Sequence, residues 1–149
     1  MAWFEGSHTT TFTVPADLAT TRAHFADPAT IVAHTEHVAS HTIGDDGTVH
    51  FVLANQDHGV VSFQGDFRCR YVLDGNTLRW TAEGGNTDQS GEATFAADGD
   101  GTKVDYTETV KVDLDVNAMM APMLKPVMGP MIAHEIKEYL KRMQKSVTA

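Results

Sequence analysis

The sequence predicts an α+β fold in which an antiparallel sheet of about seven strands is followed by one long C-terminal helix. Apolar residues alternate with polar ones along most of the chain, which indicates strands with one buried face. Turns rich in Gly and Asp separate these alternating segments, which is typical of antiparallel pairing. A helical pattern is confined to two short segments near the N-terminus and to the end of the chain.

Length, composition and charge limit the class of protein. The 149 residues are expected to form one domain, residues 1–149, and 42% hydrophobic with 21% charged residues is an ordinary globular composition. The formal net charge of −9 repels phosphate backbones, so we expect no nucleic-acid partner.

The chain shows no sign of export or of membrane insertion. A single cysteine, Cys69, excludes an internal disulfide, and residues 1–6 contain no basic and apolar signal sequence. The most apolar region, Met119–Met131, is interrupted by Lys125 and three prolines and is too short to span a bilayer. We therefore expect a cytoplasmic protein with no integral membrane segment.

The first elements are a strand and two short helices. Residues 4–14 alternate and are rich in β-branched side chains, which predicts a strand. Asp17 is placed to cap a helix over residues 18–25, and Asp27-Pro28 begins a second helix that reaches about Thr35. No Gly-rich phosphate loop joins these elements, which excludes a dinucleotide-binding crossover.

Six further strands follow without an intervening helix. They are predicted at Val38–Ile43, Thr48–Ala54, His58–Leu73, Thr77–Ala82, Ser90–Ala96 and Thr102–Val116. The turn Gly44-Asp45-Asp46-Gly47 is a hairpin signal, and similar turns separate the later strands. Strands joined by tight turns predict an antiparallel sheet with one solvated face.

The C-terminal helix is predicted to begin at a cap, Asp115 or Asn117, and to end near Lys145. Basic residues near its end complement the helix dipole. Pro122, Pro126 and Pro130 predict a loose or kinked first half, with regular helix from about Gly129.

This order of elements resembles the helix-grip fold of the START-like, polyketide cyclase/dehydrase and lipid-transport superfamily, which includes the pollen allergen-type proteins. The resemblance is carried by Val14-Pro15-Ala16-Asp17, Phe25-Ala26-Asp27-Pro28, Val61–Leu73, and Pro122–Ile132 followed by Glu135–Met143. It implies a curved sheet wrapped around the long helix, with a pocket between them for a hydrophobic ligand. Most members share no catalytic constellation, so the resemblance implies no catalytic residue.

The predicted ligand-binding residues come from the sheet and from the start of the long helix. On the sheet they are Phe63, Phe67, Trp80, Phe95, Tyr106 and Glu108, and on the helix they are Met120, Leu124, Met128 and Met131. Flexible, polarizable thioethers suit a surface that adapts to apolar ligands. The same helical spacing is also compatible with side chains that simply fill the core.

Glu108 is the one charged residue on the apolar face of its predicted strand. A buried carboxylate must be paired, protonated or directed at a polar cavity, and without a cation its pKa should rise. We weigh a ligand-orienting or acid–base role against a bulge that turns Glu108 to water, or a pairing with His or Arg. Glu135, beside Met131 and Tyr139, poses the same question on the helix.

No metal or organic cofactor is expected. His34, His37 and His41 have nitrogen ligands, but their segment crosses from a helix end into a strand, and no thiolate lies nearby in sequence. His134-Glu135 lacks the second histidine of a zincin helix, because position 138 is Glu138. No phosphate-binding loop, dinucleotide fingerprint or Gly-x-Ser-x-Gly motif is present.

The expected function is binding or transport of a hydrophobic small molecule between the sheet and the C-terminal helix. One alternative is a cyclase or dehydratase that uses the same pocket, with Glu108 and one histidine sharing proton transfer. Another is a partner-binding module like the chaperone-activating members, in which an exposed apolar face acts. The ligand, any catalytic residue and the oligomeric state are left open.

Overall fold

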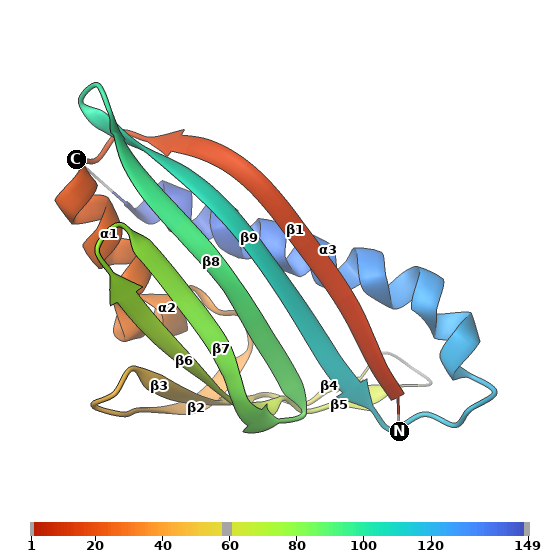
Figure 1. Ribbon diagram of the computed structural model, residues 1–149. Helices are drawn as coiled ribbons and strands as arrows, with labels where there is room; N and C mark the ends of the chain where they lie inside the picture. The colour runs from red at the N-terminus through yellow and green to blue at the C-terminus, as the bar shows by residue number, and fades with distance from the viewer. Residues whose placement is uncertain (1, 58–60, 148–149) are drawn as a thin grey trace.

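The structure, a computed structural model, describes residues 2–57 and 61–147. Its main sheet contains β1 (Ala2–Val14), β2 (Val38–Ile43), β3 (Thr48–Leu53), β6 (Asp66–Asp74), β7 (Thr77–Gly85), β8 (Thr87–Asp98) and β9 (Gly101–Leu114). These seven strands are all antiparallel to their neighbours and lie in the order β1-β9-β8-β7-β6-β3-β2. The sheet is strongly curved, and the long helix α3 (Ala121–Ser146) lies along its inner side (Figure 1). The predicted helix-grip α+β fold is thereby confirmed.

Alternation along the strands decides which side chains face the helix. In β9, every second residue from Thr102 to Glu108 is buried, and the residues between them are exposed. β1 pairs with β9 over its whole length, from Ala2 opposite Leu114 to Val14 opposite Thr102. The first and last strands are thus neighbours, and together they form the part of the sheet against which α3 packs most closely.

The two short helices form where the sequence predicts them. α1 (Leu18–Ala26) is capped by Asp17, whose side chain accepts a hydrogen bond from the Thr20 amide at 2.7 Å. α2 (Pro28–His34) begins with proline, whose fixed φ suits the first turn of a helix. Together they close one end of the space beneath the sheet.

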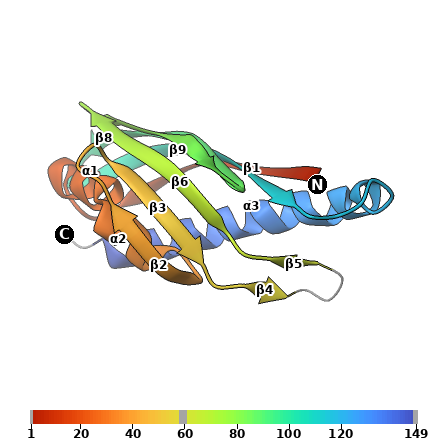
Figure 2. The ribbon, with the colours of Figure 1, turned by 90° about the horizontal axis from the view of Figure 1, so that it is seen from below.

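The predicted strand His58–Leu73 is wrong as a single element. Residues 58–60 lie outside the described residues, and the remainder divides into β5 (Ser62–Phe63) and β6. β5 pairs with β4 (Gln56–Asp57) in a separate two-stranded ribbon, which extends β3 and β6 beyond the sheet (Figure 2). The break falls at Gly65, where an added Cβ would lie 2.8 Å from Leu53 Cδ1. The break between β5 and β6 therefore falls where Gly65 packs closely against the Leu53 side chain.

The start of α3 also differs from the prediction. The Asn117 side chain accepts a hydrogen bond from the Met120 amide at 2.9 Å, but this caps a turn that precedes the helix, which begins at Ala121 without a side-chain cap. Pro126 and Pro130 lie inside α3, which runs as one helix from its first residue rather than from Gly129. The prolines repeat every four residues and all three are exposed, so the carbonyls left without a partner face water.

Close approach of α3 to β1 depends on Gly6. A Cβ added at Gly6 would lie 2.6 Å from the Gly129 carbonyl oxygen and 2.6 Å from Ile132 Cβ. The buried residues of α3, Ile132, Ile136, Leu140 and Met143, follow from this contact toward its C-terminal end. None of the helices in residues 2–57 and 61–147 is long and apolar enough to span a membrane.

Candidate functional site

A cavity of about 250 Å³ lies between the inner face of the sheet and the second half of α3. This volume is just below the range of about 300–1,000 Å³ usual for drug-sized ligands, so the space suits a smaller molecule. α3 contributes Met131, Ile132, Glu135, Ile136, Tyr139 and Arg142 to the wall. The opposite wall comes from β3, β6, β7, β8 and β9, and α1 and α2 close the end.

Glu108 lies on the sheet wall of this cavity and is only 8% exposed, as strict alternation along β9 predicts. Both of its carboxylate oxygens accept hydrogen bonds. Trp80 Nε1 donates to Oε2 at 2.9 Å, and the Tyr106 hydroxyl donates to Oε1 at 2.9 Å. The bulge that would have turned Glu108 to water is absent, because β1, β8 and β9 pair in unbroken register around it.

Gly91 makes the contact between Trp80 and Glu108 sterically possible. Trp80 on β7 pairs with Gly91 on β8, and Gly91 pairs in turn with Glu108 on β9. A Cβ added at Gly91 would lie 2.5 Å from Trp80 Cζ2, so the indole occupies the space of the missing side chain. The Trp80 ring thereby crosses the middle strand and reaches a carboxylate two strands away.

Burial raises the pKa of Glu108 from its ordinary value of 4.5 to about 7, while the hydrogen bonds from Tyr106 and Trp80 act in the opposite direction. No Lys, Arg or His of the described residues forms an ion pair with it. The carboxyl group therefore exchanges its proton near neutral pH inside an apolar cavity, which is unusual for a structural residue.

Three phenol groups line the same cavity as Glu108. Burial raises the pKa values of Tyr71, Tyr106 and Tyr139 well above their ordinary values, so all three remain protonated donors. The Tyr71 hydroxyl donates to Gln89 Oε1 at 3.4 Å. The Tyr139 hydroxyl, which faces the cavity from α3, has no hydrogen-bond partner in the part of the chain that the structure describes.

Charged groups of opposite sign lie at the α2 side of the cavity. Arg142 Nη1 is 3.2 Å from Glu36 Oε1, and Arg142 Nε donates to the His34 carbonyl oxygen at 2.9 Å. Glu135 lines the cavity from α3 and is exposed. Arg142, the one arginine among the described wall residues, is therefore already paired.

The described histidines do not assemble a metal site. Among the described residues no group of three or more His, Cys, Asp or Glu side chains is placed to hold a metal ion. Of the three histidines singled out in the sequence, His37 lines the cavity, whereas the His34 ring interacts with the Thr30 carbonyl oxygen and His41 is exposed on β2. None of the described histidines forms a hydrogen bond or ion pair with Glu108.

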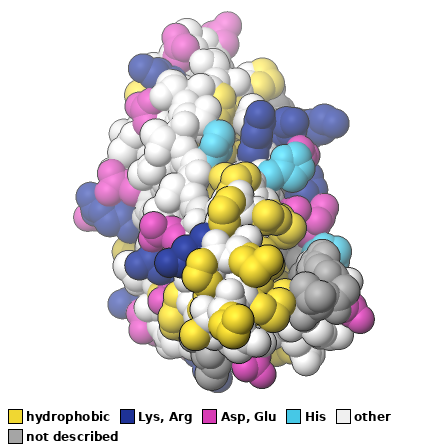
Figure 3. Space-filling view, turned by 90° about the vertical axis from the view of Figure 1, so that its right-hand side faces the viewer, with side chains coloured by type: hydrophobic (Ala, Val, Ile, Leu, Met, Phe, Trp, Pro, Cys, Tyr) yellow, Lys and Arg dark blue, Asp and Glu magenta, His cyan; other side chains and the backbone are white. Residues whose placement is uncertain are grey.

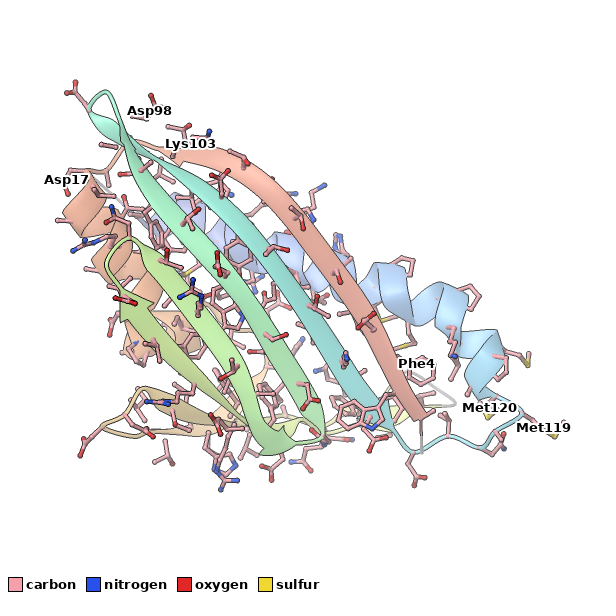
Figure 4. All side chains as sticks on the ribbon, in the orientation of Figure 1. Phe4, Asp17, Asp98, Lys103, Met119 and Met120 are labelled. Atoms are coloured by element: carbon pink, nitrogen blue, oxygen red, sulfur yellow. The ribbon has the colours of Figure 1, made fainter. Side chains whose placement is uncertain are left out.

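The structure places the predicted ligand-binding residues in two groups. Trp80, Tyr106, Glu108 and Met131 lie on the cavity wall. The other six do not line it: Phe63, Phe67, Phe95, Met120, Leu124 and Met128. Phe67 and Phe95 are buried where the core is solid, and Phe63 belongs to the β4–β5 ribbon. Met120 precedes α3 at the end remote from Asp17 and Asp98 (Figure 4).

Several wall residues were absent from the sequence-based set. The main ones are Tyr71 and Leu78 on the sheet, Ile136, Tyr139 and Arg142 on α3, and Ile31 on α2. A signal for Tyr71 was present, since it shares a strand face with Phe67 and Cys69. For α3, the four-residue spacing from Met131 through Glu135 to Tyr139 marks the helix face that borders the cavity.

Exposed apolar side chains form a patch at the start of α3 (Figure 3). Met119 is 85% and Met123 76% exposed, and Val127 and Met131, farther along α3, are also exposed. Most of the methionine-rich segment thus faces outward.

The family to which the sequence is similar agrees with the observed fold. The sequence profile of the family described as polyketide cyclase / dehydrase and lipid transport matches residues 6–148. No curated protein matches the chain.

Several solved structures share the fold at low sequence identity. The protein TTHA0849 of Thermus thermophilus has a TM-score of 0.71 at 16% identity, covering 96% of both chains. A START superfamily protein of Mycobacterium smegmatis has a TM-score of 0.63 at 16% identity, covering 95% of this chain and 99% of that one. Norcoclaurine synthase of Thalictrum flavum, solved with a transition-state analogue, has a TM-score of 0.58 at 12% identity, covering 99% of this chain and 96% of that one. At these identities the likeness establishes a common fold and nothing about the ligand.

Proposed function

The chain belongs to the polyketide cyclase/dehydrase and lipid transport family, and we propose that it binds a small hydrophobic molecule in the cavity between the sheet and α3. The observation that carries this proposal is an apolar and aromatic cavity with one buried carboxylate, Glu108, on its wall. Burial of apolar surface supplies affinity, and a few placed polar groups supply orientation. Transport of the bound molecule, if the protein is a carrier, would use the same cavity.

Ligand binding is tested directly on the purified protein. Native mass spectrometry should detect a complex with one apolar molecule, either co-purified or added as a fluorescent apolar probe. The near-ultraviolet circular dichroism spectrum should stay native throughout the titration, which excludes binding to an unfolded form. If no small apolar compound binds stoichiometrically to the native protein, the proposal is overturned.

A proton-transfer enzyme is the second candidate, and the pKa of Glu108 at about 7 is the observation that favours it. A general acid or base is most effective when its pKa lies near the working pH. Norcoclaurine synthase shows that an enzyme can be built on this fold. Glu108 would act without a histidine partner, since none of the described histidines forms a hydrogen bond or ion pair with it. Exchange of a ketone α-proton for deuterium, measured by NMR with wild type and Glu108→Gln, tests this candidate: exchange that is equal in the two proteins excludes Glu108 as the base.

The exposed patch at Met119, Met123 and Val127 is the feature that corresponds to the partner-binding alternative. Within residues 2–57 and 61–147, no charge pattern or neighbouring segment identifies what would cover it. The proposed function therefore rests on the cavity.

A further inference from the structure

The charges on the cavity wall are predominantly negative. Its acidic residues are Glu36, Glu108 and Glu135, and its basic residues are Arg142 and His37. Arg142 is paired with Glu36, and His37 Nε2 lies 3.5 Å from the other carboxylate oxygen of Glu36. Within the described residues, Glu108 and Glu135 are left without a cation. A ligand in this cavity therefore meets a negative potential.

Glu108 has hydrogen-bond donors but no counter-charge. The indole of Trp80 can donate a hydrogen bond but not accept one, and its N–H is directed at the Glu108 carboxylate. Each carboxylate oxygen can accept a second hydrogen bond, so both retain a free acceptor position after Trp80 and Tyr106 have bound. Because a buried charge is costly unless it is paired, a positive ligand group at this point would supply what the protein lacks.

The protein's own titratable groups do not supply that charge. Those that pair with Glu108 in the sheet or interact with it electrostatically are His8 on β1, Cys69 and Tyr71 on β6, Tyr106 on β9, and Tyr139 on α3. His8 is directly opposite Glu108 in the β1–β9 ladder, yet no ion pair or hydrogen bond joins the two side chains. The thiol and the phenols are neutral at physiological pH, since burial raises their pKa values.

Aromatic rings line the approach to the carboxylate. The rings of Tyr71 and Trp80 stack with centroids 6.2 Å apart, and those of Trp80 and Tyr106 lie 5.2 Å apart. Tyr139 faces this row from α3. Electron-rich rings within about 6 Å attract a cation as well as packing against an apolar body.

From this combination we infer that the ligand is a small organic amine, with an apolar, ring-containing body and a protonated nitrogen that pairs with Glu108. The inference rests on the proposed function and specifies its ligand class. The amine would donate to the free acceptor positions of Glu108, while its body packs against Trp80, Ile136 and Tyr139. The cavity volume of about 250 Å³ limits that body to a small molecule.

Three probes with one ring system separate this inference from simple apolar binding: 1-naphthylmethylamine, 1-naphthylmethanol and 1-naphthoate. They differ mainly in carrying a positive, a neutral or a negative polar group. By calorimetric titration at neutral pH, the amine should bind about 10-fold or more tightly than the alcohol, since a charge-assisted hydrogen bond is stronger than a neutral one. The naphthoate should bind most weakly.

The pH dependence gives a second readout. The amine pairs with ionised Glu108, whose pKa is about 7, so its affinity should increase from about pH 5.5 to about pH 8. Binding of the alcohol should change little over the same range.

The variant Glu108→Gln should lose both the preference for the amine and the pH dependence of amine binding, while it should still bind the alcohol. The amide can still accept from Trp80 and donate to the Tyr106 oxygen, so the fold should persist. Glu83→Gln, an exposed change on β7, is the matched control.

The outcomes are distinguishable. Equal affinity for amine and alcohol, or tighter binding of the naphthoate, would overturn the amine inference and leave apolar binding intact. An amine preference that survives in Glu108→Gln would also overturn it. If none of the probes binds and the fluorescent apolar probe also fails, the proposed function falls together with the inference. If Glu108→Gln does not fold, Trp80→Phe provides a second variant. It removes one hydrogen-bond donor to the Glu108 carboxylate and should weaken binding of the amine more than binding of the alcohol.

Discussion

Trp80 Nε1 donates a 2.9 Å hydrogen bond to Glu108 Oε2 across the full width of β8, although the two residues lie on strands that do not pair with one another. The contact exists because Gly91, between them in the ladder, has no side chain. It fixes the carboxylate in the cavity and links three strands through one indole.

Gly91→Ala should destabilise the protein and displace Trp80. The added Cβ would overlap the indole, and overpacking of this kind costs about 1–3 kcal/mol. Denaturant unfolding measures the loss, and the fluorescence of Trp80 should shift as its environment changes. Ser90→Ala, at the adjacent exposed position of β8, is the control. Equal midpoints for Gly91→Ala and wild type would show that the indole does not need this space.

Glu108→Gln should change the pH dependence of stability. Because the pKa of Glu108 is raised from 4.5 to about 7 in the folded state, the native protein binds more protons than the unfolded chain between these values. Stability of the wild type should therefore decrease as pH rises from about 4.5 to 7, by on the order of 2–3 kcal/mol from this group. The variant should lack this decrease and be relatively more stable above neutral pH. Denaturant midpoints at mildly acidic and neutral pH, compared with those of Glu83→Gln, decide the matter. Parallel pH profiles for Glu108→Gln and wild type would contradict the assigned burial.

Met131→Trp should block the cavity. Met131 lines the cavity but is 39% exposed, so a larger ring can enter the space without disrupting the buried core. Affinity for an apolar fluorescent probe should fall by about 10-fold or more, with little change in the melting temperature. Met123→Trp, on the same helix but outside the cavity and 76% exposed, is the matched control and should bind normally. Equal loss in both variants would place the binding site on the exposed patch instead.

Gly6→Ala should loosen α3 from β1. The new methyl group would lie 2.6 Å from both the Gly129 carbonyl oxygen and Ile132 Cβ, and one of these contacts is to backbone. We expect a loss of stability of about 1–3 kcal/mol, together with faster amide hydrogen exchange in α3. Ser7→Ala, on the exposed side of the same strand, removes only an exposed hydrogen bond to Thr109 Oγ1 and should leave amide exchange in α3 unchanged. Unaltered amide hydrogen exchange in Gly6→Ala would contradict the close contact between α3 and β1 at this residue.

Cys69 should be inert in the native protein. Its thiol is buried, and burial raises its pKa to about 12, so almost none of it is the reactive thiolate near neutral pH. Iodoacetamide should alkylate Cys69 only after denaturant is added, as mass spectrometry would show. Rapid alkylation of the folded protein would contradict a buried thiol on the cavity side of β6.

The sequence by itself determined the elements and their faces. Period-two alternation and Gly/Asp turns were sufficient for the strands of the main sheet, because burial of one sheet face requires that pattern, but they did not reveal the break at Gly65 that separates β5 from β6. The same alternation placed Glu108 on the buried face, since its neighbours Tyr106 and Val110 leave no other orientation in an unbroken strand. The Asp17 cap of α1 could also be predicted from the sequence, because capping depends only on residues that are close along the chain.

Only the tertiary structure decided where the space lies between the sheet and the helix. Periodicity reports which residues face inward, but not how far the opposing surface is from them, and Gly6 sets that distance for α3. The methionine-rich start of the helix consequently projects outward, while the turns from Met131 to Arg142 border the cavity. The Trp80–Glu108 contact is likewise nonlocal: it depends on Gly91 lying between them in register, and register between distant strands emerges only when the whole sheet is assembled.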